Sequence, residues 1–296
     1  MSDLLWGIDL GGTKIECAVL DGGKCIARQR IPTEADQGYR HILGRIKLLI
    51  EQTAAEVGTP PSKIGIGTPG TRDSESGLMR GCNTTCLNGQ PLLKDLENAL
   101  QMEVRIANDA NCFALAEATL GSGKGARVVF GVILGTGVGG GIVVDGKVLN
   151  GLQGIAGEWG HNLLEPEGEP CYCGRRGCVE TVLSGPALER FYFSLTNRHL
   201  DLREIVRNAV ANDAESASVV QRLVQKFGEA IGPVINILDP DLVILGGGVG
   251  SIPALLAAGA DAARPYIFNP NPRIQLAAPA LGDSAGVFGA ALLVRD

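Results

Sequence analysis

Aromatic residues and positive charge are both scarce in this chain of 296 residues. Phe, Trp and Tyr make up only 4% of the sequence, too few for the rows of aromatic side chains on which single-stranded nucleic acids stack. Lys and Arg number 26 against 32 Asp and Glu, which gives a formal net charge of −6. Because a protein that binds a phosphate backbone needs a basic surface, the composition argues against a nucleic acid as partner.

Long hydrophobic runs are also missing. No stretch offers the roughly 18 consecutive apolar residues that a membrane-spanning helix needs, so we expect no membrane partner. The sequence passes from Met1 directly into an apolar segment without a basic leader, a pattern that predicts a cytoplasmic protein. The apolar share of 45% and the charged share of 20% are those of an ordinary globular protein.

Glycine, in contrast, is abundant, and its 42 residues are about twice the usual share of ~7%. The glycines help to align the chain with itself: residues 6–11 match 130–135, and residues 19–22 match 143–146. Each copy reads as an apolar strand, a glycine turn, a second apolar strand and an Asp-Gly turn, which is typical of hairpins. Two unrelated hairpins would give the same pattern. A true duplication predicts two similar α/β lobes whose glycine turns face each other.

The rest of the sequence alternates between helical and strand periodicity, as in α/β proteins. We expect an N-terminal lobe over 1–118, completed by a last helix at about 285–296, and a C-terminal lobe over 119–284. The pattern predicts further helices over 38–57, 109–120, 184–195, 201–211 and 213–238, and strands over 63–67, 104–107 and 241–245.

Three glycine clusters are candidates for binding nucleotide phosphates. Residues 9–14 and 135–141 each join two strands, where glycine leaves backbone N–H groups open to an anion. Residues 246–248 follow a strand and precede a helix, a placement that suits the base and ribose. Glycines that merely pack in tight turns are the alternative. The candidate ATP-binding residues are Asp9, Gly11, Gly12, Thr13, Lys14, Gly135, Thr136, Gly137, Gly139, Gly140, Gly247 and Gly248, and Asp9 is also a candidate for holding Mg²⁺ through water.

A cluster of sulfur ligands lies in the second half of the chain. Cys171, Cys173 and Cys178 fall within eight residues, and His161 precedes them. Three thiolates and one imidazole form the closed tetrahedral set that structural zinc prefers. Three reduced, buried cysteines without a metal are the alternative. With zinc bound, the loop 161–178 would be rigid.

The dipeptide Asn108-Asp109 stands where a strand ends and a helix begins. Such a pair is often only a helix cap. The chemical interpretation is that Asp109 is a general base. A carboxylate at a helix N-terminus would be anionic and could accept the proton of a hydroxyl group that attacks a phosphoryl group.

The order of these motifs resembles the ROK family of sugar kinases, from residue 4 to about 291. The motifs are D-x-G-G-T-K, A-N-D-A-N, G-T-G-x-G-G-G, G-E-W-G-H and C-x-C-G-x-x-G-C-x-E, followed by a late G-G-G. The resemblance implies the two-lobed, ribonuclease H-like α/β fold of the actin-like ATPases, with ATP in a cleft between the lobes. It places the catalytic aspartate on Asp109 and the sugar contacts on Gly70, Asn83, Asn108, Asp109, Glu158, His161 and Glu180.

The resemblance further implies an ATP-dependent hexose kinase that uses Mg²⁺ and a structural Zn²⁺ and forms a homodimer. The segments 83–91 and 158–162 are most similar to the bacterial fructokinases of the family, so we expect fructose to become fructose 6-phosphate, with mannose as a second acceptor. The alternatives are an N-acetylglucosamine, N-acetylmannosamine or glucose kinase, or, from another class, a sugar sensor without catalysis.

Overall fold

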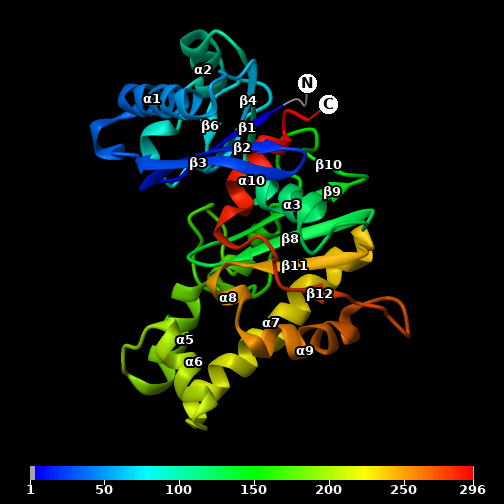
Figure 1. The fold of residues 1–296 in the computed structure, drawn as a ribbon. Helices are drawn as coiled ribbons and strands as arrows, with labels where there is room; N and C mark the ends of the chain where they lie inside the picture. The colour runs from blue at the N-terminus through cyan, green and yellow to red at the C-terminus, as the bar shows by residue number, and fades with distance from the viewer. Residues whose placement is uncertain (1–3, 296) are drawn as a thin grey trace. The chain divides into compact units, whose positions relative to one another are not determined.

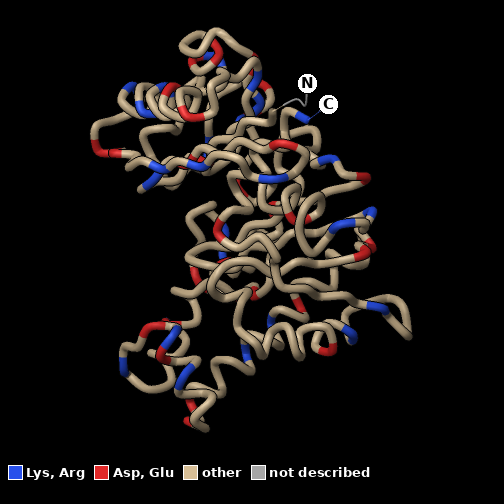
Figure 2. Tube along the Cα trace, viewed as in Figure 1, with Lys and Arg blue, Asp and Glu red and all other residues tan. Residues whose placement is uncertain are grey.

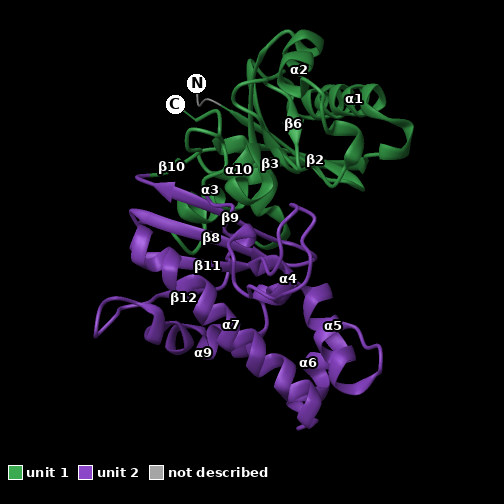
Figure 3. Ribbon diagram, turned by 180° about the vertical axis from the view of Figure 1, so that it is seen from behind, with its two compact units in different colours: residues 1–124, 146–156, 281–296 green, residues 125–145, 157–280 purple. Residues whose placement is uncertain are grey.

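A computed structural model describes residues 4–295, and the chain divides into two compact units (Figures 1 and 3). Unit 1 comprises residues 1–124, 146–156 and 281–296, and unit 2 comprises 125–145 and 157–280. The segment 146–156, which we expected in the C-terminal lobe, therefore groups with unit 1. Its Gly154 gives the physical reason, because a methyl group there would lie 3.2 Å from Thr71 Cγ2 of unit 1.

Unit 1 is built on a five-stranded sheet in the order β3-β2-β1-β4-β7. Its strands are β1 (Leu5–Leu10), β2 (Lys14–Asp21), β3 (Lys24–Pro32), β4 (Lys63–Thr68) and β7 (Glu103–Asn108), and a small hairpin joins β5 (Thr71–Arg72) to β6 (Met79–Arg80). Its helices are α1 (Tyr39–Val57), α2 (Leu92–Leu100), α3 (Asp109–Leu120) and α10 (Ala285–Leu292).

Glycines let helix α10 approach the sheet of unit 1 unusually closely. A methyl group on Gly7 of β1 would collide with the backbone of Val287 and Ala291, and one on Gly65 of β4 would collide with Ala290. On its other side, Gly289 leaves no room for a side chain against the backbone of α3. Because the backbones touch at these points, small residues are obligatory there.

Unit 2 repeats the plan of unit 1 with the sheet order β10-β9-β8-β11-β12. Its strands are β8 (Val128–Leu134), β9 (Val138–Val144), β11 (Leu242–Gly246) and β12 (Leu276–Ala277), and the edge strand β10 (Lys147–Val148) belongs to the segment 146–156 that groups with unit 1. Its helices are α4 (Val179–Leu183), α5 (Gly185–Thr196), α6 (Leu202–Val210), α7 (Ala214–Leu238), α8 (Gly247–Gly250) and α9 (Pro253–Ala263). Short 3-10 turns complete the two units at Ala35–Gln37, Thr85–Leu87, Trp159–His161 (η3), Arg264–Tyr266 and Gly282–Ser284.

The two sheets confirm that the aligned segments are structural repeats. In unit 1 the antiparallel hairpin β1–β2 is followed by β4 and β7 parallel to β1. In unit 2 the antiparallel hairpin β8–β9 is followed by β11 and β12 parallel to β8. Each hairpin turn falls on one of the aligned glycine clusters. The helices and strands predicted from periodicity are present, with bounds that differ by one or two residues, except that the last helix ends at Leu292 and not at about 296.

Charged residues are interspersed along both units, and Figure 2 shows no stripe of basic residues on the trace of the described chain. This distribution agrees with the acidic composition. In the part of the chain that the structure describes, no helix combines the length and apolarity required to cross a membrane.

A buried carboxylate fixes two loops of unit 1. Glu117, near the end of α3, has no exposed surface. Its side chain accepts hydrogen bonds from the backbone N–H of Ser122 at 3.0 Å and of Leu281 at 2.9 Å. These two residues stand next to the points where the chain leaves and re-enters unit 1. Glu117 therefore satisfies backbone groups in both segments at once.

Replacing Glu117 with alanine should lower the free energy of unfolding by about 2–4 kcal/mol, because two backbone N–H groups lose their acceptor and a cavity remains. Urea denaturation measures the change. The matched control is Glu97→Ala on the exposed face of α2, which should stay within about 0.5 kcal/mol of wild type. Equal stability of the two variants would contradict the role of Glu117.

Candidate functional site

Two carboxylates of unit 1 stand at the same edge of its sheet. Asp9 lies near the end of β1, and Asp109 follows the end of β7 as the first residue of α3. Strand β4 runs between them, with Gly67 opposite Asp9 and Thr68 opposite Asn108. Because these three strands are parallel, their carboxyl ends meet at this edge, which is the usual location of ligand sites in α/β proteins.

Burial makes both acids harder to ionise. Burial raises the pKa of Asp9 to about 6, and the nearby charges of Asp109 and Glu16 add to the effect. Loss of hydration also raises the pKa of Asp109, although hydrogen bonds from Ala110 and Asn108 oppose it. The Asp109 side chain nevertheless remains accessible to solvent. We expected a helix N-terminus to favour the anion; the structure instead gives a base that is partly desolvated and thus more basic.

Asn108 connects Asp109 to the turn after β4. Its Oδ1 accepts a hydrogen bond from Ala110 N–H at 2.9 Å, which makes it the N-cap of α3, and its Nδ2 donates to Gly70 O at 3.0 Å. Gly70 has φ +72° and no room for a side chain beside Arg80 and Cys82. The candidate sugar residues Gly70, Asn108 and Asp109 therefore lie together, and Asn83, exposed, directly follows Cys82.

The first glycine turn lies close to this group. Gly11 N–H donates to Lys14 O at 3.0 Å, and a methyl group on Gly12 would lie 3.2 Å from Thr84 Oγ1, beside Asn83. Thr33, which sequence reasoning missed, braces the turn from β3 by donating its hydroxyl to Gly11 O at 2.7 Å. The exposed side of the turn consists of Gly12, Thr13 and Lys14, so its N–H groups and hydroxyl are open to an anion.

A carboxylate from another part of the chain braces the second glycine turn, in unit 2. Glu180 Oε2 accepts a hydrogen bond from Val138 N–H at 3.0 Å, and a methyl group on Gly137 would lie 2.7 Å from the same oxygen. The α5 residue Gly185 donates its N–H to Gly135 O at 2.8 Å. Glu180, expected only as a sugar contact, is thus also a structural partner of the predicted phosphate turn.

The third glycine cluster, at the start of α8, lies beside the same turn. Gly247 has φ +81° and leaves no room for a side chain next to the backbone of Leu134, the residue before the turn. Gly248 is exposed. Gly135, Thr136, Gly137, Gly247 and Gly248 are therefore neighbours within unit 2.

Gly139 and Gly140 differ from the other candidates for ATP binding. Both lie inside β9, and Trp159 Nε1 donates a hydrogen bond to Gly139 O at 2.9 Å. A methyl group on Gly140 would lie 2.8 Å from both Gly157 O and the Trp159 ring. Packing around Trp159, which is buried against Phe130 and Phe227, explains why position 140 is glycine.

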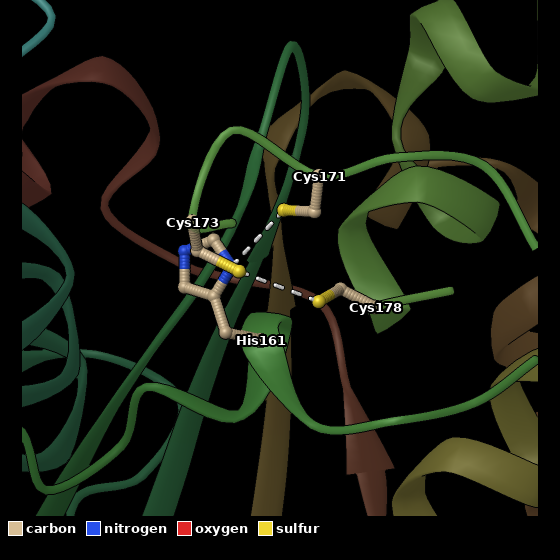
Figure 4. Close-up of side chains that lie close together, drawn as sticks. All are labelled: His161, Cys171, Cys173 and Cys178. Atoms are coloured by element: carbon tan, nitrogen blue, oxygen red, sulfur yellow. Dashed lines mark hydrogen bonds between the residues drawn. The ribbon is translucent and has the colours of Figure 1, made fainter. Parts of the chain in front are cut away.

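The four metal-ligand candidates converge in unit 2 (Figure 4), with His161 Nδ1 and the three thiols all within 4.8 Å of one another. Cys173 Sγ lies 3.6 Å from Cys178 Sγ, and Cys171 Sγ lies 3.5 Å from His161 Nδ1. A tetrahedral zinc ion with ordinary Zn–S and Zn–N bonds places its ligand atoms roughly 3.5–3.8 Å apart. The donor types and spacing therefore fit zinc, and four protein ligands leave no open position for catalysis.

Two glycines fold the chain around this cluster. Gly174 and Gly177 have φ +87° and +62°, and Gly177 packs directly against Glu165 O. Although burial opposes it, a backbone hydrogen bond from Arg175 leads the contacts that lower the pKa of Cys173 to about 6. A low thiol pKa favours the thiolate, which is the form that binds a metal.

Tyr172, between two of the cysteines, is a residue of this site that sequence reasoning missed. Its hydroxyl lies 3.0 Å from His161 Nε2, the ring nitrogen that we expected to face a sugar hydroxyl. Burial and the charges of Glu180 and Glu158 raise the pKa of Tyr172 to about 12. The phenol therefore stands among three of the candidate sugar residues, although no motif marks it.

The fold and these sites define a class of protein: a duplicated α/β ATPase-like chain with glycine turns, a pair of acids and a Cys₃His cluster. The ROK family model matches residues 5–296, and the chain belongs to the ROK family. An N-acetyl-D-glucosamine kinase of Escherichia coli is 35% identical over 98% of this chain and 99% of its own length.

Solved structures agree in fold. A ROK hexokinase from Thermus thermophilus superimposes with a TM-score of 0.90 at 35% identity, covering 98% of this chain and 97% of the other. A ROK glucokinase from Streptomyces griseus, solved with glucose and AMPPNP, gives 0.79 at 28% identity over 99% of both chains. The chain thus has the two-lobed α/β fold of the actin-like ATPases, as the sequence predicts.

A methyl group at position 137 should disrupt the Glu180 contact. We expect Gly137→Ala to lower the free energy of unfolding by about 1–3 kcal/mol, because Glu180 must move away from its hydrogen bond. Gly135→Ala is the control, since a methyl group there has no heavy atom within 4 Å. Thermal unfolding of the nucleotide-free protein measures both, and an unchanged Gly137→Ala would contradict the arrangement.

The raised pKa of Asp9 determines how the stability of the folded protein changes with pH. Between its ordinary value of 3.8 and about 6, the unfolded chain loses its proton while the folded protein keeps it, so stability falls as pH rises. Asp9→Asn removes this penalty. In Mg²⁺-free buffer at pH 8 the variant should be more stable than wild type by about 1–3 kcal/mol, and the difference should vanish below pH 4.

Urea unfolding at both pH values tests this prediction. The control is Asp145→Asn at the turn between β9 and β10, where the carboxylate is 68% exposed and a substitution should change stability by less than about 0.5 kcal/mol. An Asp9→Asn variant no more stable than wild type at pH 8 would show that the carboxylate is not penalised.

Proposed function

We propose that this ROK protein transfers the γ-phosphoryl group of ATP to a hydroxyl group of N-acetyl-D-glucosamine or glucose. The observation that carries the proposal is the position of Asp109: a desolvated but accessible carboxylate, next to the turn at Gly70 and on the same sheet edge as Asp9. A pure helix cap would need neither solvent access nor a second acid beside it.

Asp109 is the general base in this proposal. It accepts the proton of the sugar hydroxyl while that oxygen attacks the γ-phosphorus, and its raised pKa makes it a better acceptor than an ordinary carboxylate. Asn108 holds it in place: the Asn108 amide is fixed between Ala110 and Gly70, so Asp109 cannot swing freely. Asn83, Glu158 and Glu180 are the further proposed sugar contacts. His161 would join them where a sugar hydroxyl replaces the Tyr172 hydroxyl at Nε2.

The glycine turns at 11–14 and 135–137 are the proposed phosphate contacts, with Gly247 and Gly248 nearer the base and ribose. Asp9 would hold Mg²⁺ through water; its oxygens are the hard donors that this ion prefers, and a cation would relieve the repulsion from Asp109 and Glu16. When bound, Mg²⁺ supplies charge neutralisation for the phosphates. Gly139 and Gly140 stay proposed ATP contacts, although packing around Trp159 by itself requires glycine at position 140.

The acceptor in this proposal differs from the fructose that we expected. The full-length relative at 35% identity is an N-acetyl-D-glucosamine kinase, and the glucokinase at 28% was solved with glucose. The expectation of fructose relied on the segments 83–91 and 158–162, and in the second of these Trp159 is buried in the core. A buried residue that packs against its own unit carries little information about a bound sugar.

Zinc in the Cys₃His cluster would hold the loop that presents Glu158, His161 and Glu180. This stiffening role follows from the closed ligand set. A homodimer and a cytoplasmic location stay predictions.

Asp109→Asn should reduce kcat by about 10²–10⁴-fold, because the amide cannot accept the hydroxyl proton. Sugar binding, measured by isothermal titration calorimetry, should be retained. Glu103→Gln, at the opposite end of β7 and 52% exposed, is the control and should turn over like wild type. Wild-type turnover in Asp109→Asn would remove Asp109 as the base.

The acceptor is decided by ADP release with a panel of N-acetylglucosamine, N-acetylmannosamine, glucose, fructose and mannose, with the product position read by NMR. We expect the highest kcat/KM for N-acetylglucosamine or glucose. A preference for fructose would restore our first expectation, and no sugar-dependent ADP release from any of them would favour the sensor.

A further inference from the structure

Tyr172 lies between two metal-ligand candidates on a tightly folded backbone. Cys171 N–H donates to Arg175 O at 2.7 Å and Gly174 N–H donates to Cys171 O at 3.0 Å, so the loop turns sharply around Tyr172. The side chain is 75% exposed. An aromatic ring gains little from apolar burial in such a place, so its orientation must have another cause.

The ring of Tyr172 is directed at His161. The two rings meet edge to face, with centroids 5.1 Å apart and an interplanar angle of 87°. The Tyr172 hydroxyl lies 3.0 Å from Nε2, on the side of the imidazole away from Nδ1, which lies 3.5 Å from Cys171 Sγ. One ring nitrogen thus points to the thiols and the other to the phenol.

The protonation of His161 follows from this geometry. A metal ion binds the lone pair of Nδ1, so the neutral imidazole must carry its proton on Nε2. The Nε2–H group then donates to the Tyr172 oxygen. Ligating histidines commonly donate their second N–H to a fixed acceptor, which sets the tautomer and the ring orientation.

We infer that Tyr172 is a positioning residue for the metal site: its hydroxyl oxygen accepts the Nε2 proton of His161 and holds Nδ1 toward the three thiols. The inference goes beyond the proposed function, because it concerns metal affinity whether or not the protein phosphorylates a sugar. It also gives His161 a partner from its own loop, in a position that we expected a sugar hydroxyl to fill.

The test is the affinity of the purified full-length protein for Zn²⁺, measured by competition with a chromogenic chelator. Tyr172→Phe keeps the ring and loses the acceptor, whereas Tyr172→Leu loses both. We expect both variants to bind Zn²⁺ about 10-fold or more weakly than wild type. Tyr266→Phe, which removes a hydroxyl from a part of unit 2 outside this loop, should bind like wild type.

Two outcomes overturn the inference. Wild-type affinity in Tyr172→Phe, with or without a loss in Tyr172→Leu, would show that the hydroxyl has no role in holding the metal. The second readout is thermal unfolding of the metal-free proteins, in which wild type and Tyr172→Phe should unfold at the same temperature. A loss of stability in Tyr172→Phe as large without metal as with it would identify a general packing role instead.

Discussion

Burial of two neighbouring carboxylates, Asp9 and Asp109, is the constraint on which the candidate site of unit 1 depends. Neither carboxylate is fully hydrated, and the charge of Asp109 adds to the cost of ionising Asp9. Burying two carboxylates lowers the stability of the folded chain. A site that binds phosphate and a cation and accepts a hydroxyl proton nevertheless needs negative charge and little water. Such stored electrostatic strain is a common feature of active sites, where stability is lower than it could be.

The neighbouring acid Glu16 shows how the fold limits that strain. It lies opposite Asp9 on β2, is buried, and forms ion pairs with Arg28 and Arg30 of β3. Its charge is therefore balanced within the sheet. Within the part of the chain that the structure describes, Asp9 and Asp109 form no ion pair of this kind, which leaves their charge for a bound ligand to balance.

The duplicated hairpins have diverged in the same respect. The residue of β8 that aligns with Asp9 is Ile133, so the second turn has lost the acid of the first. A carboxylate returns to that turn from elsewhere in unit 2, because Glu180 accepts the N–H of Val138. The duplication therefore gives two similar glycine turns. In the second turn a carboxylate is supplied by Glu180 of α4, which directly follows the metal-ligand loop.

The sequence predicted what depends on neighbours along the chain. Helix periodicity, the two hairpins and the Cys₃His cluster are local patterns, and the structure contains all of them. Contacts between distant segments were beyond reach: Glu117 with Leu281, Glu180 with Val138, and Thr33 with Gly11. Glycine was the least informative residue. The same letter marks an open turn at position 12 and backbone packing at position 140, and only the three-dimensional neighbours distinguish them.

The close packing of α10 against β1 and β4 has a consequence for folding during synthesis of the chain. This helix consists of residues near the very end of the chain, yet it fills the face of the sheet that begins at Leu5. A ribosome must therefore synthesise the chain as far as Leu292 before helix α10 can cover β1 and β4. Until then the sheet surface around Gly7 and Gly65 is uncovered, and unit 1 is an incompletely folded intermediate of the kind that chaperones bind.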